Sequence, residues 1–258
     1  MGTFKCDCEN CKYPGCRCQD GYVFKDGYCR PCDVFKEWKK SEVYSVQCEK
    51  AGLGNDRKPL DFSDYRGEDD NIPILEELSK DYSRFLGENL YVYGDNSTQK
   101  TTMLKAYGRH IIWNNRDYDF MCWPALIRFI SMSDVQRLLR ELDQIDCEDR
   151  EDKEYFLNTY KECKILILDE SFDSTKMQAS RKDEYNVQLM DGFIRERLCK
   201  ADKTTIFISN VRPEKIDDKF GKSFKELIIR SCGLLEFNFK IEKPENRMPK
   251  FSIRGTGR

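Results

Sequence analysis

The sequence has a single histidine and almost no excess of charge of either sign. His110 is the only histidine in 258 residues, and 44 lysines and arginines stand against 46 aspartates and glutamates, a formal net charge of -2. No overall basic field favours nucleic acid, so any such contact must come from a local patch. The length is enough for one full core and a small appended module.

Long apolar runs are also lacking. The run at residues 165–168 is far too short to cross a bilayer, and residues 1–5 lack the apolar core of a signal peptide. We therefore expect a cytoplasmic protein that does not contact a membrane.

The cysteines are concentrated near the N-terminus. Of 13 cysteines, seven lie within residues 6–32, and Cys8-x2-Cys11 and Cys29-x2-Cys32 are separated by 17 residues. This is zinc-ribbon spacing, in which each pair directs two thiolates toward one tetrahedral ion. Because His110 is far away in the sequence, all the ligands would be cysteines. The sequence predicts a structural Zn²⁺ site formed by these four residues.

Two alternatives for the cysteines stay open. Cys6, Cys16 and Cys18 are left over, and they can replace a member of the first pair or hold a second ion. The stretch from Cys16 to Cys29 also matches the tail of an epidermal-growth-factor-like disulfide module. That module would require secretion and would leave Cys32 unpaired, so we favour metal over disulfides.

Helical and strand-like patterns alternate along the rest of the chain. Strands are predicted at residues 90–93, 126–130, 165–168, 204–209 and 234–239. Helices are predicted at 34–50, 74–86, 100–112, from a capping box Ser133-x-x-Gln136 onward, and at 155–163, 186–200, 213–220 and 223–231. This alternation predicts a five-stranded parallel α/β sheet flanked by helices. We expect a cysteine-rich module at 1–50, a linker at 51–72 and the α/β domain at 73–258.

The stretch GDNSTQKTT at residues 94–102 follows the first predicted strand and precedes a helix. It fits the phosphate-binding pattern G-x-x-x-x-G-K-[ST], except that glutamine replaces the second glycine. Backbone N–H groups of such a loop surround phosphates, its lysine reaches the β and γ phosphates, and its threonine binds Mg²⁺. The predicted nucleotide-binding residues are Gly94, Asp95, Asn96, Ser97, Thr98, Gln99, Lys100, Thr101 and Thr102.

Polar residues also follow two other predicted strands. Asp169 and Glu170 come directly after residues 165–168, and Asn210 follows residues 204–209. Ligands of parallel sheets bind beyond the carboxyl ends of the strands. We expect Asp169 to hold Mg²⁺ with Thr101, Glu170 to polarise the attacking water and Asn210 to orient it. Alternatively, the acidic pair begins a helix and Asn210 is a cap. The agreement of three strand ends favours an ATP and Mg²⁺ site.

Several segments together resemble the DnaC/DnaI/IstB family of AAA+ ATPases, the replicative helicase loaders of bacteria and phages and their transposition relatives. The segments are DGYCRPC, AGLGNDRKPLDFSDY, NLYVYGDNSTQKTTML, LIRFISMSDVQRLLREL, KILILDE and TTIFISNVRPEKI. The resemblance implies an ATPase domain that binds single-stranded DNA and assembles side by side. It also implies an N-terminal zinc module that contacts a hexameric helicase, with ATP turnover as the switch.

The sequence departs from the family at two places. Ser97 and Gln99 replace glycine, which we expect to reduce affinity or turnover. The family also has an arginine that reaches the neighbouring subunit's γ-phosphate. Leu227 is at the matching position, so Arg230 is the candidate, and Arg247 is the candidate for a second sensor.

Two further functions stay open, and several residues are candidates for DNA contact. One alternative is a non-hydrolysing adaptor on the same fold, and the other is an IstB-like transposition ATPase. Basic and aromatic residues that are candidates for contacting single-stranded DNA are Arg109, His110, Trp113, Arg116, Arg137 and Arg140.

Overall fold

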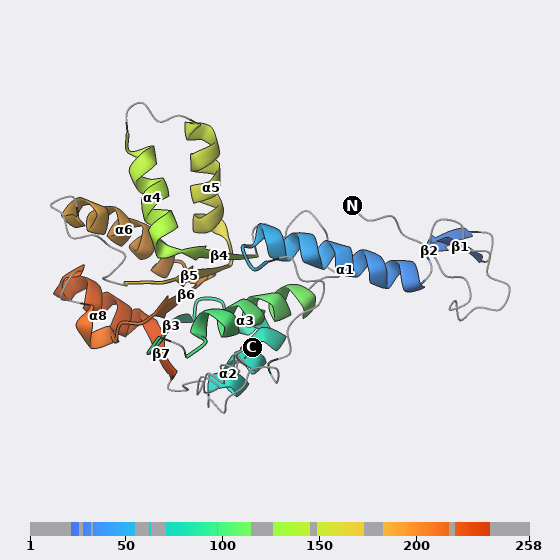
Figure 1. Cartoon of the computed structure of the whole chain (residues 1–258), viewed down its shortest axis with the longest axis horizontal. Helices are drawn as coiled ribbons and strands as arrows, with labels where there is room; N and C mark the ends of the chain where they lie inside the picture. Colours follow the sequence, from blue (N-terminus) through green and yellow to red (C-terminus); the bar gives the residue numbers. More distant parts are fainter. Residues whose placement is uncertain are drawn as a thin grey trace, which may run out of the picture.

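The computed structural model describes two sheets connected by a long helix. The described residues are 22–25, 28–31, 33–54, 62, 71–96, 98–114, 126–144, 149–172, 183–216 and 220–237. The smaller sheet is an antiparallel pair, β1 (Tyr22–Lys25) and β2 (Tyr28–Pro31). It lies at the far end of α1 (Asp33–Lys50), away from the main body (Figure 1).

The larger sheet has five strands, all parallel to their neighbours. They are β3 (Asn89–Gly94), β4 (Ile127–Ser131), β5 (Ile165–Asp169), β6 (Thr204–Ser209) and β7 (Cys232–Phe237). Their order in the sheet is β4-β5-β6-β3-β7. The predicted five-stranded parallel α/β sheet is therefore confirmed. Because the strands are parallel, all their carboxyl ends lie at one edge, and β6 separates β3 from β5.

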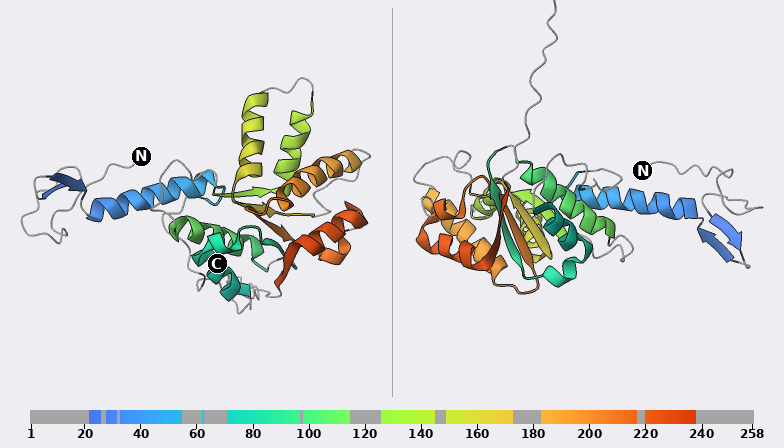
Figure 2. Two further views of the ribbon diagram at one scale, coloured as in Figure 1. Left: turned by 180° about the vertical axis from the view of Figure 1, so that it is seen from behind. Right: turned by 90° about the horizontal axis from the view of Figure 1, so that it is seen from below.

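Helices cover both faces of this sheet (Figure 2). On one face lie the end of α1, α2 (Asn71–Lys80) and α3 (Lys100–Asn114). On the other face lie α4 (Met132–Leu142), α5 (Arg150–Glu162), α6 (Asp183–Leu198) and α8 (Lys222–Ser231). Short 3-10 turns occur at η3 (Tyr82–Phe85) and η5 (Pro213–Lys215). Within the described ranges, no helix is long and apolar enough to span a bilayer.

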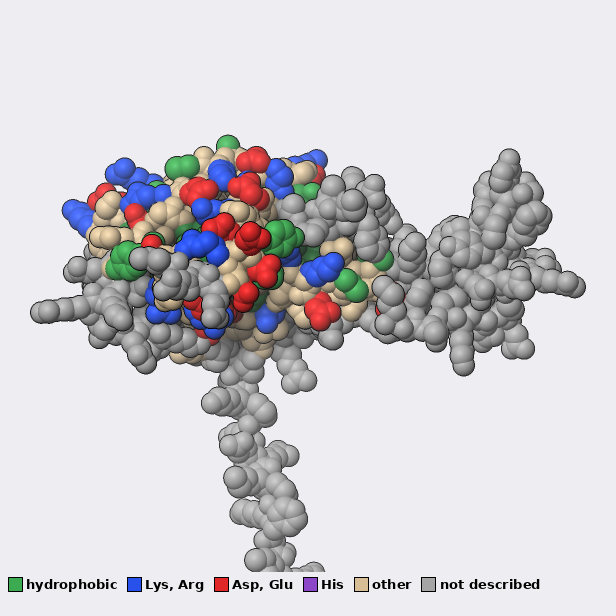
Figure 3. Space-filling view, turned by 90° about the horizontal axis from the view of Figure 1, so that it is seen from above, with side chains coloured by type: hydrophobic (Ala, Val, Ile, Leu, Met, Phe, Trp, Pro, Cys, Tyr) green, Lys and Arg blue, Asp and Glu red, His purple; other side chains and the backbone are tan. Residues whose placement is uncertain are grey.

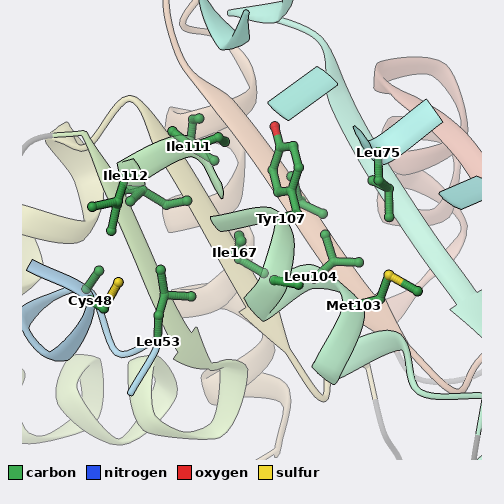
Figure 4. Packing of buried hydrophobic residues seen from close by; sticks show 14 of the residues in the cluster. Cys48, Leu53, Leu75, Met103, Leu104, Tyr107, Ile111, Ile112 and Ile167 are labelled. Atoms are coloured by element: carbon green, nitrogen blue, oxygen red, sulfur yellow. The ribbon is translucent and has the colours of Figure 1, made fainter. Parts of the chain in front are cut away.

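Strand β5 is buried on both faces. Ile165 and Ile167 pack in the cluster with α3, and Leu166 and Leu168 pack in the cluster with α4 and α6. Figure 4 shows Ile167 among the side chains of the first cluster. A strand covered on both faces needs apolar residues at every position, which is why this run lacks the alternation of a half-exposed strand.

The C-terminal end of α1 is part of the core of the α/β body. Tyr44 and Cys48 are fully buried in the cluster with α3. Beyond the helix, Phe129 of β4 donates a backbone hydrogen bond to Ala51 O at 2.7 Å. A Cβ atom on Gly52, which has φ +79, would lie 2.2 Å from Phe129 O, so this close approach requires glycine. Helix α1 is thus attached to the edge strand β4, and the predicted division into domains stays a prediction.

The start of α4 differs from the prediction. Ser131, the last residue of β4, is the N-cap, and its Oγ accepts a hydrogen bond from Asp134 N at 3.1 Å. The predicted capping box at Ser133 is therefore wrong by two residues. The reason is that Ser131 keeps an extended backbone, as an N-cap requires, while Ser133 is already inside the helix.

Boundaries of further elements also differ from the predicted ones, for example in α5 and β7. Helix α5 begins at Arg150 rather than at 155, and β7 begins at Cys232 rather than at 234. The acidic residues Glu151 and Asp152 lie in the first turn of α5, where the helix dipole favours negative charge.

A buried arginine provides a test of how the fold is stabilised. Arg197 is 0% exposed and donates hydrogen bonds to the carbonyl oxygens of Lys161, Cys163 and Thr204, at 2.9, 2.6 and 2.9 Å. Arg197→Leu should lower the free energy of unfolding by about 3 kcal/mol, because buried carbonyls lose their donors. Urea unfolding measures this. Arg195→Leu, which removes a side chain that is 40% exposed, should cost less than about 1 kcal/mol. Equal losses in the two variants would contradict the prediction.

Candidate active site

The loop between β3 and α3 begins with a glycine that contacts the neighbouring strand closely. A Cβ atom on Gly94 would lie 2.1 Å from Phe237 O of β7, so no other residue fits here without displacing backbone. The loop leads directly into α3, since Met103 N donates to Gln99 O at 2.9 Å. The first amides of a helix have no partner within it, and together with the helix dipole they favour an anion.

The side chain of Lys100 folds back into this loop. It is 5% exposed, and its ammonium donates to Gly94 O, Asp95 O and Thr98 Oγ1 at 2.9, 2.8 and 3.0 Å. Thr98 Oγ1 in turn donates to Asp95 O at 2.9 Å. Burial lowers the pKa of Lys100, while the negative charges of Asp169 and Asp95 oppose this shift. The loop is therefore curved around a desolvated positive charge.

Thr101 faces the end of β5. Its hydroxyl donates to Asp169 Oδ1 at 3.0 Å, and Glu170 N donates to the same oxygen at 2.9 Å. Burial raises the pKa of Asp169, and these two hydrogen bonds oppose the rise. A hydroxyl beside a carboxylate offers the hard oxygen ligands that Mg²⁺ prefers. Thr101 and Asp169 are the residues that would hold such an ion.

The turn after Asp169 has an unusual backbone. Glu170 and Phe172 both have positive φ, +53 and +62, which is costly for residues other than glycine. Phe172 is 2% exposed, and its ring packs among aromatic rings from both the sheet and the α8 region. These rings are Tyr91, Phe207, Phe220 and Phe224, with centroid distances of 5.0 to 5.9 Å. This packing stabilises the turn that presents Glu170.

A hollow of about 340 Å³ lies at the carboxyl edge of the sheet, where these elements meet. Its walls are formed by the loop and first turn of α3, by the end of β5 and by the end of β6. The lining residues are Asn96, Thr98, Gln99, Lys100, Thr101, Asp169, Glu170, Ile208, Ser209 and Asn210. The structure thus brings together eight of the residues that the sequence suggested for nucleotide binding and catalysis, and adds Ile208 and Ser209.

The other predicted nucleotide-site residues lie around or away from this hollow. Gly94 and Asp95 contribute carbonyl oxygens to Lys100. Thr102 is exposed on the first turn of α3, and Ser97 lies outside the described residues. Arg230 is exposed in the last turn of α8 and does not line the hollow.

The predicted zinc site falls almost entirely outside the described residues. Cys8, Cys11 and Cys32 are not among them, and for Cys29 in β2 only the backbone is described. Within the part of the chain that is described, no group of histidine, cysteine and acidic side chains forms a metal site. The zinc site stays a prediction, as does the sensor role of Arg247, which also lies outside the described residues.

Three of the candidates for DNA contact make contacts within the protein. Arg109 is 8% exposed and donates from Nε to Leu53 O at 2.9 Å. The His110 ring stacks on Phe62 at 4.7 Å, and Trp113 packs edge-on against Tyr44 at 5.2 Å. These side chains therefore have structural roles at the end of α3.

The remaining candidates do not define a basic patch. Arg137 and Arg140 are exposed on α4, and Arg116 lies outside the described residues. On the face shown in Figure 3, basic and acidic side chains are interspersed.

Sequence reasoning did not single out Ser209. It was predicted only as the last residue of a strand, although it lines the hollow and is 1% exposed. The available signal was a small hydroxyl residue that directly follows three apolar residues of the strand and directly precedes Asn210.

Comparisons with known proteins identify the fold. No protein-family profile and no curated protein matches the chain. Among solved structures, the DnaC helicase loader superposes with a TM-score of 0.52 and 17% identity, covering 69% of this chain and 96% of that one. The replication initiator DnaA bound to AMPPCP and single-stranded DNA superposes with a TM-score of 0.50 and 20% identity, over 69% of this chain and 50% of that one. The α/β body therefore has the same fold as these two proteins.

The backbone of Gln99 provides a test of strain in the loop. Its φ of +57 lies in the left-handed region, which glycine adopts at no steric cost. Gln99→Gly should therefore raise the free energy of unfolding by about 1 kcal/mol, measured by urea unfolding. As a control, Gln188→Gly on the exposed face of α6 should lower it by about 1 kcal/mol, because glycine weakens a helix. A loss of stability in both variants would contradict the prediction that the backbone of Gln99 is strained.

The raised pKa of Asp169 predicts that the charge of this side chain lowers the stability of the folded protein. Because the pKa is above 3.8 in the folded state, ionisation above that pH destabilises the fold. Asp169→Asn keeps an oxygen acceptor for Thr101 and Glu170 N but removes the charge. The variant should melt at a higher temperature than wild type at pH 7, and the difference should shrink as the pH falls towards 3.8.

A second variant controls for the removal of a carboxylate in general. Asp152→Asn changes an exposed residue in the first turn of α5, and it should lower the melting temperature slightly at pH 7, because the helix dipole favours that charge. A higher melting temperature for Asp152→Asn, or a lower one for Asp169→Asn, would contradict the prediction that the charge of Asp169 destabilises the folded protein.

Proposed function

We propose that the chain is an ATPase that loads a hexameric replicative DNA helicase, with ATP binding and hydrolysis to ADP and phosphate as the switch. The observation that carries the proposal is the convergence of five side chains on one hollow at the carboxyl edge of the sheet. They are Lys100, Thr101, Asp169, Glu170 and Asn210. They combine a cation for phosphate, oxygen ligands for Mg²⁺ and polar groups for a water molecule.

ATP would bind with its phosphates against the loop and the N-terminus of α3. The Lys100 ammonium would exchange its hydrogen bonds to neutral loop oxygens for charged phosphate oxygens, which are stronger acceptors. Thr101 and Asp169 would hold Mg²⁺, which neutralises charge on the β and γ phosphates when bound. The loop reads phosphates and not the base, so adenine is assigned on the likeness of the fold.

Hydrolysis would depend on Glu170 and Asn210. The carboxylate of Glu170 would accept a hydrogen bond from the attacking water and draw its proton away, and the Asn210 amide would orient the same water. The two residues lie at the ends of β5 and β6, neighbouring strands of the sheet. Glu170, which has a positive φ, directly follows β5 and lines the hollow.

The fold likeness supports a role in helicase loading. The superposition covers 96% of the chain of a DnaC helicase loader, and the DnaA structure is bound to single-stranded DNA. A hexameric helicase and single-stranded DNA are therefore the proposed partners, and such a loader works in the cytoplasm. The cysteine-rich N-terminus would bind Zn²⁺ and contact the helicase, which agrees with the position of β1 and β2 at the far end of α1 (Figure 1).

Side-by-side assembly is the proposed active form when nucleotide and DNA are bound. Arg230 is exposed on α8, where it is available to a neighbouring copy of the chain. In that arrangement its guanidinium would approach the γ-phosphate held by the neighbour's loop and stabilise charge in the transition state.

One observation favours a second candidate, a non-hydrolysing adaptor on the same fold. Gln99 adopts a left-handed conformation in the loop without being a glycine, and it lines the hollow. An adaptor would recruit its partner equally well with or without Glu170.

Two site variants and one control test the proposal. Wild type should bind Mg·ATP in calorimetry, and Lys100→Ala should bind it at least about tenfold more weakly with the fold intact. Glu170→Gln should bind Mg·ATP but lose hydrolysis. Lys215→Ala, an exposed lysine on η5, should behave as wild type. Circular dichroism checks that each variant is folded.

A pull-down with the replicative helicase, with and without ATP, tests the partner. ATP-dependent capture by wild type that is lost in Lys100→Ala supports the loader. Absence of ATP binding at millimolar nucleotide would refute the proposed ATPase. Capture and loading that are unchanged in Glu170→Gln would support the adaptor instead.

A further inference from the structure

Ser209 is a buried polar residue at the wall of the hollow, and the mechanism above does not use it. It is the last residue of β6, pairs with Tyr93 of β3 in the sheet and is 1% exposed. A buried hydroxyl is costly unless both its donor and acceptor capacities are used. The hydrogen bonds of this side chain therefore indicate its role.

The Ser209 hydroxyl joins two chain segments. Its Oγ donates to Ser171 O at 2.5 Å and accepts from Val211 N at 3.0 Å. Ser171 N also donates to Ile208 O at 2.7 Å. The regular pairing of β5 with β6 ends at Leu168 and Phe207. These bonds thus extend the connection between the two strands past the ladder, up to the hollow.

The two backbone groups that bond to Ser209 Oγ lie next to proposed catalytic residues. Ser171 follows Glu170, and Val211 follows Asn210. Val211 is also held from the other side, because Tyr91 Oη donates to Val211 O at 2.9 Å. The segment after Asn210 is therefore fixed at both its amide and its carbonyl group.

The turn that presents Glu170 needs support from outside. With positive φ at Glu170 and Phe172, it is a strained turn that persists only where its surroundings impose it. The hydroxyl of Ser171 does not connect it to β6, because that group donates to Leu168 O of β5 at 2.7 Å. The Ser209 side chain does connect this turn to the segment carrying Asn210.

We propose that Ser209 is a positioning residue for ATP hydrolysis, whose hydroxyl holds Glu170 and Asn210 at a fixed separation around the attacking water. This inference rests on the proposed ATPase function. In this role Ser209 acts through its hydrogen bonds to Ser171 and Val211 and does not contact the phosphates. Its loss should therefore slow the chemical step and leave nucleotide binding, which depends on the loop, unchanged.

Single-turnover hydrolysis and nucleotide affinity separate these effects. Ser209→Ala should hydrolyse ATP about tenfold more slowly than wild type, with a Kd for Mg·ATP within about twofold. Ser79→Ala is the matched control, because it removes a hydroxyl that is 1% exposed and donates to Glu76 O at 2.7 Å on α2, a helix that does not line the hollow. It should lose stability by a similar amount and keep the wild-type rate.

Coupling to Asn210 tests the mechanism of positioning. In the Asn210→Ala background, Ser209→Ala should lower the hydrolysis rate by a further factor of less than about two. The reason is that the effects of substitutions in residues that act as a unit are not additive. If Ser209→Ala does not fold, Ser209→Cys takes its place, since the thiol has a similar shape and is a weaker donor. That variant should show a reduced rate with unchanged affinity.

Several results would overturn the inference. A rate for Ser209→Ala within about twofold of that of Ser79→Ala would show that the hydroxyl contributes stability alone. Fully multiplicative losses in the double variant would show that Ser209 does not act through Asn210. If wild type binds ATP without hydrolysing it, the proposed turnover is refuted as well. If wild type hydrolyses ATP normally and Ser209→Ala has the same hydrolysis rate, only this inference is refuted.

Discussion

One hydrogen bond, from the Thr101 hydroxyl to Asp169 Oδ1, connects the two halves of the candidate site. Thr101 follows β3 and Asp169 ends β5, and β6 lies between these strands in the sheet. The two residues meet only because the loop after β3 crosses the end of β6 to reach α3. The strand order, the glycine at the start of the loop and the direction of α3 all contribute to this single contact.

A positive and a negative side chain lie in the site beside this contact. Lys100 and Asp169 are both desolvated, with a lowered and a raised pKa respectively, and the negative charge of Asp169 partly offsets the shift in the pKa of Lys100. Around them the loop supplies carbonyl and hydroxyl oxygens to the cation, and Thr101 and the Glu170 amide supply donors to the anion. The fold therefore maintains opposite charges a short distance apart without joining them in a direct ion pair, which leaves both available to a charged ligand.

Much of the architecture could be predicted from the sequence, because it depends on local patterns. The apolar run of β5, the Lys-Thr pair after β3 and Asn210 after β6 identified the sheet and the residues around the hollow. The N-cap of α4 was missed, since Ser131 and Ser133 are both plausible caps and only the end of β4 decides between them. The role of Ser209 was missed because it depends on bonds to a turn 38 residues away, which the register of β5 and β6 brings together.

Helix α1 connects the small antiparallel sheet to the strands that carry the site. An 18-residue helix is about 27 Å long, and this one joins the edge strand β4 through the close contact at Gly52. Strand β4 in turn pairs with β5 over its whole length, with Ser131 opposite Asp169. The β1–β2 sheet is therefore connected to the strand that ends in Asp169 through the helix, the edge strand β4 and one ladder of hydrogen bonds.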